Sequence, residues 1–238
     1  MNDRGTLIAV EGIDGSGKQT QVRLLARGLE SRGYQVLSTG FPQYGSWFGK
    51  MVGQFLNGDL GPLNSVDPHF AALLYAGDRF ECRQPIVSAL EKGVIVLADR
   101  YVASSLAHQA VRAAPEKRAE FRAWIEHLEY NIYGLPREDL VLYLRLPPGE
   151  AQKLIAKKSA RAYTDSAHDI LESNIRHLQA AADMYDELAR AVDWKTIECF
   201  DVAKQVIRSE QEISADVLAA VLPSIAPLQK ERSSRGFL

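Results

Sequence analysis

The chain has few cysteines, no long apolar segment and almost no net charge, and each deficit excludes a class of protein. Cys82 and Cys199 are the only cysteines among 238 residues, too few for a disulfide framework or a cysteine-rich metal cluster. We expect both to pack as small apolar residues in a reducing compartment. No apolar run is long enough to cross a bilayer, and no apolar signal segment precedes the first strand-like run. The sequence therefore predicts a soluble, cytoplasmic protein without a membrane partner.

The charges of the chain nearly cancel, with 28 Lys and Arg residues against 30 Asp and Glu residues and a net charge of -2. A chain with this balance creates no overall positive field that would attract nucleic acid or an anionic membrane. We therefore expect no nucleic-acid polymer as a partner, and any basic binding site must be local.

What the chain does have is a regular alternation of short apolar runs and helical patterns. The apolar runs, which are typical of buried strands, are residues 6–10, 35–39, 93–98, 140–146 and 194–200. Helical spacing of apolar residues fills the intervals, at residues 21–33, 47–56, 69–90, 102–113, 116–131, 150–158, 169–188 and 213–222. The alternation predicts an α/β protein with three layers, in which a five-stranded parallel sheet has helices on both faces. We predict one domain over residues 1–227 and a mobile polar tail over residues 228–238.

A glycine-rich loop follows the first strand-like run and opens the first helix. Its sequence is Gly12, Ile13, Asp14, Gly15, Ser16, Gly17, Lys18, Gln19 and Thr20. Glycines let the backbone turn tightly so that successive N–H groups face phosphate oxygens, and the helix adds the positive end of its dipole. Lys18 adds a positive charge for the terminal phosphates. The loop therefore predicts nucleotide binding, although Gln19 stands where the usual pattern has a magnesium-binding Ser or Thr, and Thr20 comes one residue late.

Four segments resemble thymidylate kinases in their order and spacing. They are residues 11–20 (EGIDGSGKQT), 41–44 (FPQY), 73–79 (LLYAGDR) and 99–105 (DRYVASS). The resemblance covers residues 6–222 and implies a P-loop nucleoside monophosphate kinase. Such an enzyme transfers the γ-phosphoryl group of ATP to deoxythymidine monophosphate (dTMP), with Mg2+ as the metal. The family's loop pattern, G-x-D-G-x-G-K-x-T, tolerates Gln19 and keeps the threonine at Thr20.

The resemblance assigns the residues that handle phosphate charge and the metal. ATP is expected on the glycine-rich loop, and the expected catalytic residues are Lys18, Asp14, Arg100 and Arg161. Arg100 is implied to bind the acceptor phosphate, and Asp14 to lie near the acceptor sugar and the metal, unless Asp14 caps the following helix. Asp99 either contacts Mg2+ through water or orients Arg100. Arg161 belongs to a lid at about residues 157–168, with a solvated surface charge as the alternative.

The resemblance also assigns the acceptor pocket. Phe41 is implied to pack near the sugar and base, and Tyr44 to bind the acceptor phosphate. Tyr75 and Arg79 are four residues apart, hence on one helix face, and match the family's stacking aromatic and base-reading arginine. The rest of the pocket wall is expected from Ser104, Ser105, His108 and Gln109.

Three departures from the family pattern affect these expectations. His108 stands where many relatives have tyrosine, which bears on how a 2′-hydroxyl is excluded. Gln43 replaces an arginine that is often found between the proline and the tyrosine. The lid segment is less rich in arginine than in many bacterial relatives, and Gly15 stands where some relatives place arginine, so a lid cation is expected to replace it.

Other functions remain open at this point. A different nucleoside monophosphate kinase and a deoxynucleoside kinase would share the phosphate loop, and the latter would need a carboxylate such as Glu11 to activate a neutral hydroxyl. A nucleotide-binding module without catalysis is the third possibility, although the guanine-reading N-K-x-D pattern is absent. The resemblance also implies a homodimer, for which helices before Leu90 and after Val102 are the candidates.

Overall fold

A five-stranded parallel sheet forms the centre of the protein. The computed structural model describes residues 4–156, 171 and 175–235. The strands are β1 (Leu7–Glu11), β2 (Val36–Gly40), β3 (Ile95–Asp99), β4 (Leu140–Arg145) and β5 (Trp194–Glu198), in the spatial order β2-β3-β1-β4-β5. Every pair of neighbours in this order is parallel. The predicted five-stranded parallel sheet is confirmed.

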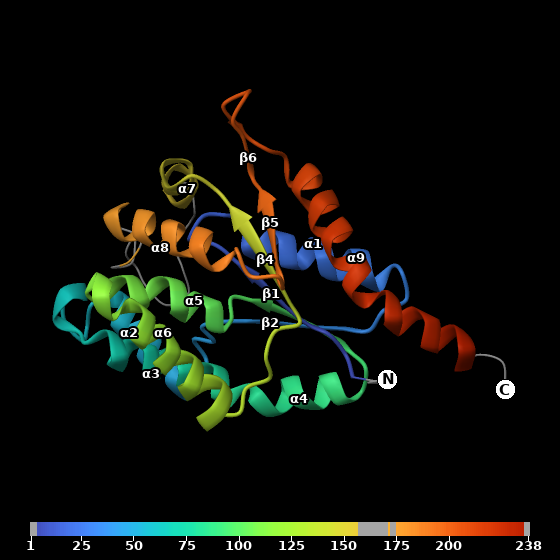
Figure 1. The fold of residues 1–238 in the computed structure, drawn as a ribbon, viewed down its shortest axis with the longest axis horizontal. Coiled ribbons are helices and arrows are strands. Elements are labelled where there is room, and N and C mark those ends of the chain that lie inside the picture. Colours follow the sequence, from blue (N-terminus) through green and yellow to red (C-terminus); the bar gives the residue numbers. More distant parts are fainter. Residues whose placement is uncertain (1–3, 157–170, 172–174, 236–238) are drawn as a thin grey trace.

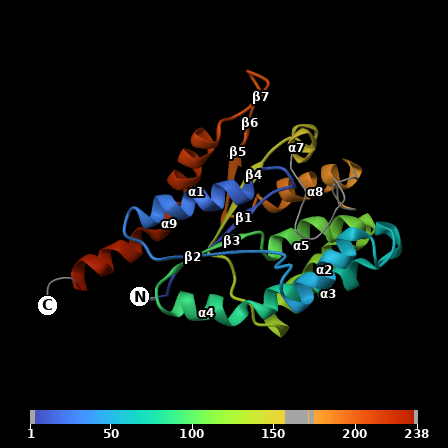
Figure 2. The same ribbon diagram turned by 180° about the vertical axis from the view of Figure 1, so that it is seen from behind.

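Helices cover both faces of the sheet and complete the three layers (Figures 1 and 2). On one face, α1 (Lys18–Glu30) packs against α9 (Glu210–Arg235). The other helices lie on the opposite side: α2 (Trp47–Asn57), α3 (Pro68–Glu81), α4 (Arg83–Glu91), α5 (Val102–His108), α6 (Arg118–Glu126), α7 (Pro148–Ile155) and α8 (Ile175–Leu188). None of the helices in the described ranges combines the length and apolar character that a membrane span requires.

The central strands are buried on both faces, which explains their continuous apolar sequences. Leu7, Ile8, Ala9 and Val10 of β1 each have 0% of their surface exposed. With helices on both sides, neither face of these central strands meets water, so they do not alternate polar and apolar residues as half-exposed strands do. The same covering holds the main hydrophobic core between the sheet and both helical layers.

The single helix predicted over residues 69–90 is wrong, because α3 and α4 are separate helices that meet at Cys82. Pro85 explains the break. It has no N–H to donate to the carbonyl of Glu81, and in a continuous helix its ring would collide with that carbonyl. The apolar spacing is nearly continuous across the junction, so the periodicity alone hides it.

The two helices predicted next along the chain also differ from the structure. The first consists of α5 and a 3-10 turn at Ala110–Arg112, and the second consists of α6 and a π-helical turn at His127–Ile132. Short 3-10 and π turns keep the chain helical while changing which side chains face inward. The π-helical turn contains the buried Glu129, which is important for the site described below.

The C-terminal region holds two differences from the sequence analysis. An antiparallel hairpin of β6 (Phe200–Asp201) and β7 (Val206–Ile207) projects beyond the end of the sheet (Figure 1) and was not predicted. The closing helix α9 extends to Arg235, well beyond residues 213–222. Residues 228–235, assigned to a mobile tail, are therefore helical, while the domain boundary at residue 227 stays a prediction.

The strand order creates a natural binding position at the carboxyl edge of the sheet. The chain leaves β1 toward β2 on one side and leaves β3 toward β4 on the other, although β1 and β3 are neighbours. A parallel sheet binds ligands at such a switch point, where the two loops diverge. Val10 pairs with Asp99 across this position, so the loop after β1 and the segment from Arg100 lie side by side.

Candidate active site

The glycine-rich loop has the backbone conformation that its glycines permit. Gly12, Gly15 and Gly17 all have positive φ angles, of 142°, 83° and 86°. A Cβ at Gly12 would come within 2.7 Å of the carbonyl oxygen of Leu144, and a Cβ at Gly15 within 2.5 Å of the carbonyl oxygen of Ala151. At Gly12 and Gly15, any other residue would therefore be strained by the positive φ angle, and its Cβ would collide with a backbone carbonyl oxygen.

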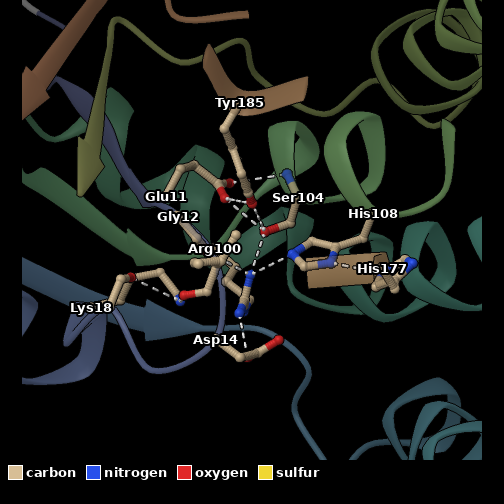
Figure 3. A network of polar contacts seen from close by, with 11 residues as sticks. Glu11, Gly12, Asp14, Lys18, Arg100, Ser104, His108, His177 and Tyr185 are labelled. Carbon is tan, nitrogen blue, oxygen red and sulfur yellow. Dashed lines mark hydrogen bonds and ion pairs between the residues drawn. The ribbon is translucent and has the colours of Figure 1, made fainter. Parts of the chain in front are cut away.

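Lys18 begins α1 and folds back over this loop. Its Nζ donates to the carbonyl oxygen of Ile13 at 2.8 Å, and the side chain is buried (Figure 3). Burial, together with the positive charge of Arg100, lowers the pKa of Lys18 to about 8. A phosphate group beside Lys18 would favour the charged form of its ammonium group.

A cavity of about 910 Å³ opens beside the loop and collects most of the predicted site residues. The predicted acceptor residues all line it: Asp14, Phe41, Tyr44, Tyr75, Arg79, Arg100, Ser104, Ser105, His108 and Gln109. The predicted nucleotide and metal residues that line it are Gly15, Gly17, Lys18, Gln19, Thr20 and Asp99. Gly12, Ile13 and Ser16 of the loop are not part of its wall, and Arg161 lies outside the described residues.

Several wall residues were missed by the sequence analysis. They are Gly40, Pro42, Leu56, Leu154, Leu171 and Glu210. The leucines belong to amphipathic patterns or to connections between helices, and no sequence signal distinguishes a leucine that lines a pocket from one that fills a core. Lys18 was predicted from the loop itself, whereas Phe41, Tyr44, Tyr75, Arg79 and Arg100 were predicted only because the family resemblance assigned them.

Arg100 is held at the centre of the site by an ion pair (Figure 3). Its Nη2 lies 2.6 Å from Oδ1 of Asp14, and its Nη1 donates to the carbonyl oxygen of Gly12 at 3.2 Å. The residue has a positive φ of 67°, uncommon for a residue with a side chain. Burial opposes its charge, but Asp14, together with Tyr185, Glu11 and Asp99, outweighs this effect and holds the pKa of Arg100 well above its ordinary value.

The ion pair bears on the two roles expected of Asp99. The guanidinium group of Arg100 is paired directly with Asp14, and the role of Asp99 in orienting Arg100 stays a prediction. Asp99 lines the cavity at the end of β3. The expected role of Asp99 in metal binding stays a prediction.

Glu11 is buried beneath the site and fully engaged (Figure 3). Its carboxylate accepts hydrogen bonds from the backbone N–H of Tyr101 at 2.7 Å, from the hydroxyl of Ser104 at 2.7 Å and from the hydroxyl of Tyr185 at 2.8 Å. It is not part of the cavity wall. Glu11 therefore fixes the segment after β3, and its position gives no support to activation of a substrate hydroxyl.

Arg79 is more constrained than a simple base-reading residue. Its Nε and Nη2 form a two-pronged ion pair with Glu129 at 2.5 and 2.6 Å, and only 1% of Arg79 is exposed. Further bonds run from Nη2 to the hydroxyl of Ser105 and from Nη1 to the carbonyl oxygen of Tyr101. These bonds use four of the five guanidinium N–H groups, and the side chain still reaches the cavity wall.

Glu129 was missed because nothing in the local sequence distinguishes it from a solvent-facing helical glutamate. Its carboxylate has 0% exposure and lies 50 residues away from Arg79 in the chain. Burial disfavours the charge of Arg79, yet Glu129 outweighs this and raises the pKa of Arg79. The pair keeps the arginine charged and fixes the plane of its guanidinium group.

Two further contacts position the acceptor wall. Asp78 accepts hydrogen bonds from the backbone N–H of Gln43 and the hydroxyl of Ser46, which fixes the loop that carries Phe41 and Tyr44. Gln43 turns its amide toward Thr39, so the residue that departs from the family pattern is not part of the cavity wall.

Two other wall residues, Gln109 and Tyr75, also have fixed contacts. Arg112 donates to the side-chain oxygen of Gln109 at 2.6 Å. The ring of Tyr75 packs edge-on against Phe55, with 6.3 Å between the ring centres. Most of the residues that line the cavity come from α1, α2, α3, α5, α7 and α9, from the loops after β1 and β2, and from the segment after β3.

Comparison with known proteins gives a consistent result. The family model described as Thymidylate kinase matches residues 10–213. A probable thymidylate kinase from Pyrococcus horikoshii is 33% identical over 221 residues, which is 92% of this chain and 96% of that protein. The thymidylate kinase of Mycobacterium tuberculosis is 32% identical over 186 residues, or 77% of this chain and 85% of the relative.

A solved structure agrees with the fold. The thymidylate kinase of Candida albicans superimposes with a TM-score of 0.70 at 20% sequence identity, over 92% of this chain and 91% of the other. Broad substrate specificity and a novel structural element are ascribed to the Candida protein. At this identity the likeness establishes the shared fold, and the residues of the site must be judged from their own geometry.

Proposed function

Because this chain belongs to the thymidylate kinase family, we propose that it transfers the γ-phosphoryl group of ATP to the 5′-phosphate of dTMP, giving ADP and dTDP. The observation that carries the proposal is the composition of the cavity beside the loop. It joins a phosphate-binding loop with Lys18 to an arginine, Arg100, and to a wall that contains the aromatic residues Phe41 and Tyr75. Donor and acceptor phosphates would thus share one space with Lys18 and Arg100, with a planar base against the aromatic wall.

The chemistry fits an acceptor that is itself a phosphate. A phosphate monoester loses its second proton near a pKa of about 6, so it is largely dianionic at neutral pH and needs no general base. The buried position of Glu11 is consistent with this requirement. Phosphoryl transfer depends mainly on positioning and charge neutralisation, for which Lys18 and Arg100 are suitably placed. We assign the lid cation to Arg161, from the resemblance alone.

Arg79 and Tyr75 are our candidates for base recognition. The fifth guanidinium N–H of Arg79 is the one available to donate to a base carbonyl, since the bonds to Glu129, Ser105 and Tyr101 use the other four. The aromatic ring of Tyr75 supplies a flat apolar surface on the same helix. Because Glu129 fixes the guanidinium plane, it fixes the direction of that remaining donor.

We propose Mg2+ as the metal that accompanies ATP. Asp14, Asp99 and Thr20 bring oxygen ligands to the cavity wall, and oxygen is the donor that Mg2+ prefers. No group of three His, Cys, Asp or Glu side chains in the described ranges converges on one point, which agrees with a metal held by one or two carboxylates and by substrate phosphates. When bound, Mg2+ neutralises charge that develops on the phosphoryl oxygens.

A homodimer and a cytoplasmic location complete the proposal. Phe70, Leu73 and Phe80 form an exposed apolar stripe along α3, because residues spaced by three and seven lie on one helix face. This stripe, before Leu90, is the surface we assign to a second copy. Of the helices after Val102, α5 has all seven residues buried within the chain, so it offers no surface for pairing. The free cysteines Cys82 and Cys199 suit a reducing compartment.

The role of the loop is tested with Lys18→Ala. We expect kcat for dTDP formation to fall by about 10²-fold or more, because one transition-state charge contact is lost from a buried site. Lys117→Ala, the same substitution at an exposed lysine before α6, should leave kcat unchanged. A Lys18→Ala enzyme with wild-type turnover would remove the loop from the mechanism.

A further inference from the structure

Two buried histidines extend the contacts of Arg100, from His108 in the cavity wall to His177 behind it (Figure 3). The Nη1 of Arg100 lies 3.4 Å from Nε2 of His108, and Nδ1 of His108 lies 3.3 Å from Nε2 of His177. Both histidines are nearly inaccessible, with 6% and 7% of their surfaces exposed. His108 comes from α5, and His177 comes from α8, which follows the predicted lid segment in sequence.

The chemistry of arginine determines the direction of these hydrogen bonds. A guanidinium group has only donors, so Nε2 of His108 must be the acceptor and carry no hydrogen. A neutral imidazole then has its hydrogen on Nδ1, which donates to Nε2 of His177. His177 must in turn carry its own hydrogen on Nδ1. One donor at Arg100 therefore fixes the tautomers of both rings.

The surroundings keep both rings neutral. Burial and the charge of Arg100 hold the pKa of His108 well below its ordinary value, and burial and Arg112 lower the pKa of His177 to about 4. Asp14 opposes both shifts without reversing them. A neutral ring is required of His108, since an imidazolium would present a hydrogen to the guanidinium group.

The contact of His108 matters because the acceptors around Nη1 of Arg100 compete. Nη1 has two hydrogens and three acceptors within reach, namely the carbonyl oxygen of Gly12, the hydroxyl of Ser104 and Nε2 of His108. The hydroxyl of Ser104 also contacts the carboxylate of Glu11. A ring held with its acceptor toward Arg100 therefore limits the rotation of the guanidinium group.

We propose that His177 is a positioning residue, which holds the ring of His108 as a hydrogen-bond acceptor and thereby orients Arg100 in the cavity. The proposal rests on the proposed function, in which Arg100 binds the acceptor phosphate. No residue of α8 lines the cavity. Through His177 and His108, α8 would therefore affect acceptor binding indirectly. The ion pair with Asp14 remains when His177 is lost, so the expected effect is partial.

The tautomers are tested directly, without substrate. Long-range ¹H–¹⁵N spectra of the full chain with ¹⁵N-labelled histidine should show His108 and His177 as neutral rings with hydrogen on Nδ1 at pH 7. His108→Gln and His177→Gln chains assign the two signals. Hydrogen on Nε2 of His108, or a charged ring, would overturn the proposal whether or not the protein phosphorylates dTMP.

The kinetic test is a double-mutant cycle on the acceptor. His177→Phe removes the hydrogen-bond acceptor but keeps a ring, and the KM for dTMP should rise by about 3- to 10-fold, the change that one net hydrogen bond produces, while the KM for ATP stays within about 2-fold. His177→Gln should restore the KM, because its amide oxygen accepts from His108. In a His108→Phe background, His177→Phe should have no further effect.

Additive effects in the cycle would show that His177 acts by another route. A His177→Gln enzyme as impaired as His177→Phe would show that a hydrogen-bond acceptor at this position is not what sustains acceptor binding. Either result overturns the proposal. Absence of dTDP formation in the wild-type enzyme would instead refute the proposed function and leave the tautomer measurement standing as the test of the histidine chain.

Discussion

At the scale of single residues, the site depends on buried charges that hold one another in place. Arg79 and Glu129 illustrate this, because both are almost fully buried and each supplies the other's counter-charge. Such a pair is costly to break, since the remaining partner becomes an uncompensated charge in the interior. Arg79→Ala would therefore impair folding as well as base recognition, and it is a poor test of the latter.

Glu129→Gln is a better test of base recognition than Arg79→Ala, because it leaves Arg79 in place. We expect it to lower the free energy of unfolding by roughly 3 kcal/mol, because Arg79 loses its counter-charge, and to raise the KM for dTMP more than that for ATP, because the guanidinium plane is no longer fixed. Urea denaturation and steady-state kinetics measure the two effects.

The matched control is Glu120→Gln, the same substitution at an exposed position of α6. It should change neither the stability nor the KM values measurably. Equal rises in the two KM values for Glu129→Gln would contradict a specific role of this residue at the acceptor base.

At the scale of elements, the phosphate loop is shaped by what packs against it. The N-terminal half of α7 abuts the loop, and the carbonyl oxygen of Ala151 is 2.5 Å from the position of a Cβ at Gly15. Gly17 has almost the same φ, but nothing lies within 4 Å of its Cβ position. A side chain at Gly17 would therefore be strained only by its left-handed backbone conformation. A side chain at Gly15 would in addition collide with the backbone of α7.

We predict that Gly15→Ala destabilises the ligand-free protein more than Gly17→Ala does. Both variants incur about 1–2 kcal/mol for a left-handed residue with a side chain, and only Gly15→Ala must also displace backbone of α7. Thermal unfolding followed by circular dichroism compares them. Equal shifts in Tm would mean that α7 moves away from an added Cβ at little cost, and that its contact with Gly15 does not stabilise the loop.

The spacing of apolar residues predicted some of the helices and strands correctly and missed others. The central strands β1, β3 and β4 were predictable because continuous buried apolar runs between turn residues have few other interpretations, and the partly exposed β2 and β5 were found as shorter apolar runs. The break at Cys82 and the π-helical turn around Glu129 were missed, because helical spacing continues through both. The hairpin of β6 and β7 has two residues per strand, too few for any pattern to emerge.

At the scale of the whole molecule, the sheet brings distant segments to one edge. Asp14, Tyr75 and Arg100 lie far apart in sequence and line one cavity. Their identities came from resemblance to a family, and sequence reasoning alone gave phosphate binding at the loop. Glu129 and His177 could not be inferred, since their roles arise from tertiary contacts of otherwise ordinary helical residues.

The exposed stripe on α3 leads to a prediction about assembly. Leu73→Lys should convert a dimer into a monomer in sedimentation velocity, because it places a charge in an apolar contact. Val192→Lys, at an apolar residue with 94% exposure outside the stripe, should leave the dimer intact. Identical sedimentation of the wild type and Leu73→Lys would assign the interface, if one forms, to another surface.

In the proposed reaction, the cavity binds thymidine monophosphate as the acceptor of a phosphoryl group from ATP. A direct assay mixes the purified protein with ATP, Mg2+ and, in separate reactions, dTMP, dUMP, UMP, CMP and thymidine, and quantifies the phosphorylated product. We expect dTDP formation with the highest kcat/KM for dTMP and no phosphorylation of thymidine. Preference for UMP or CMP, or phosphorylation of thymidine but not of dTMP, would contradict it.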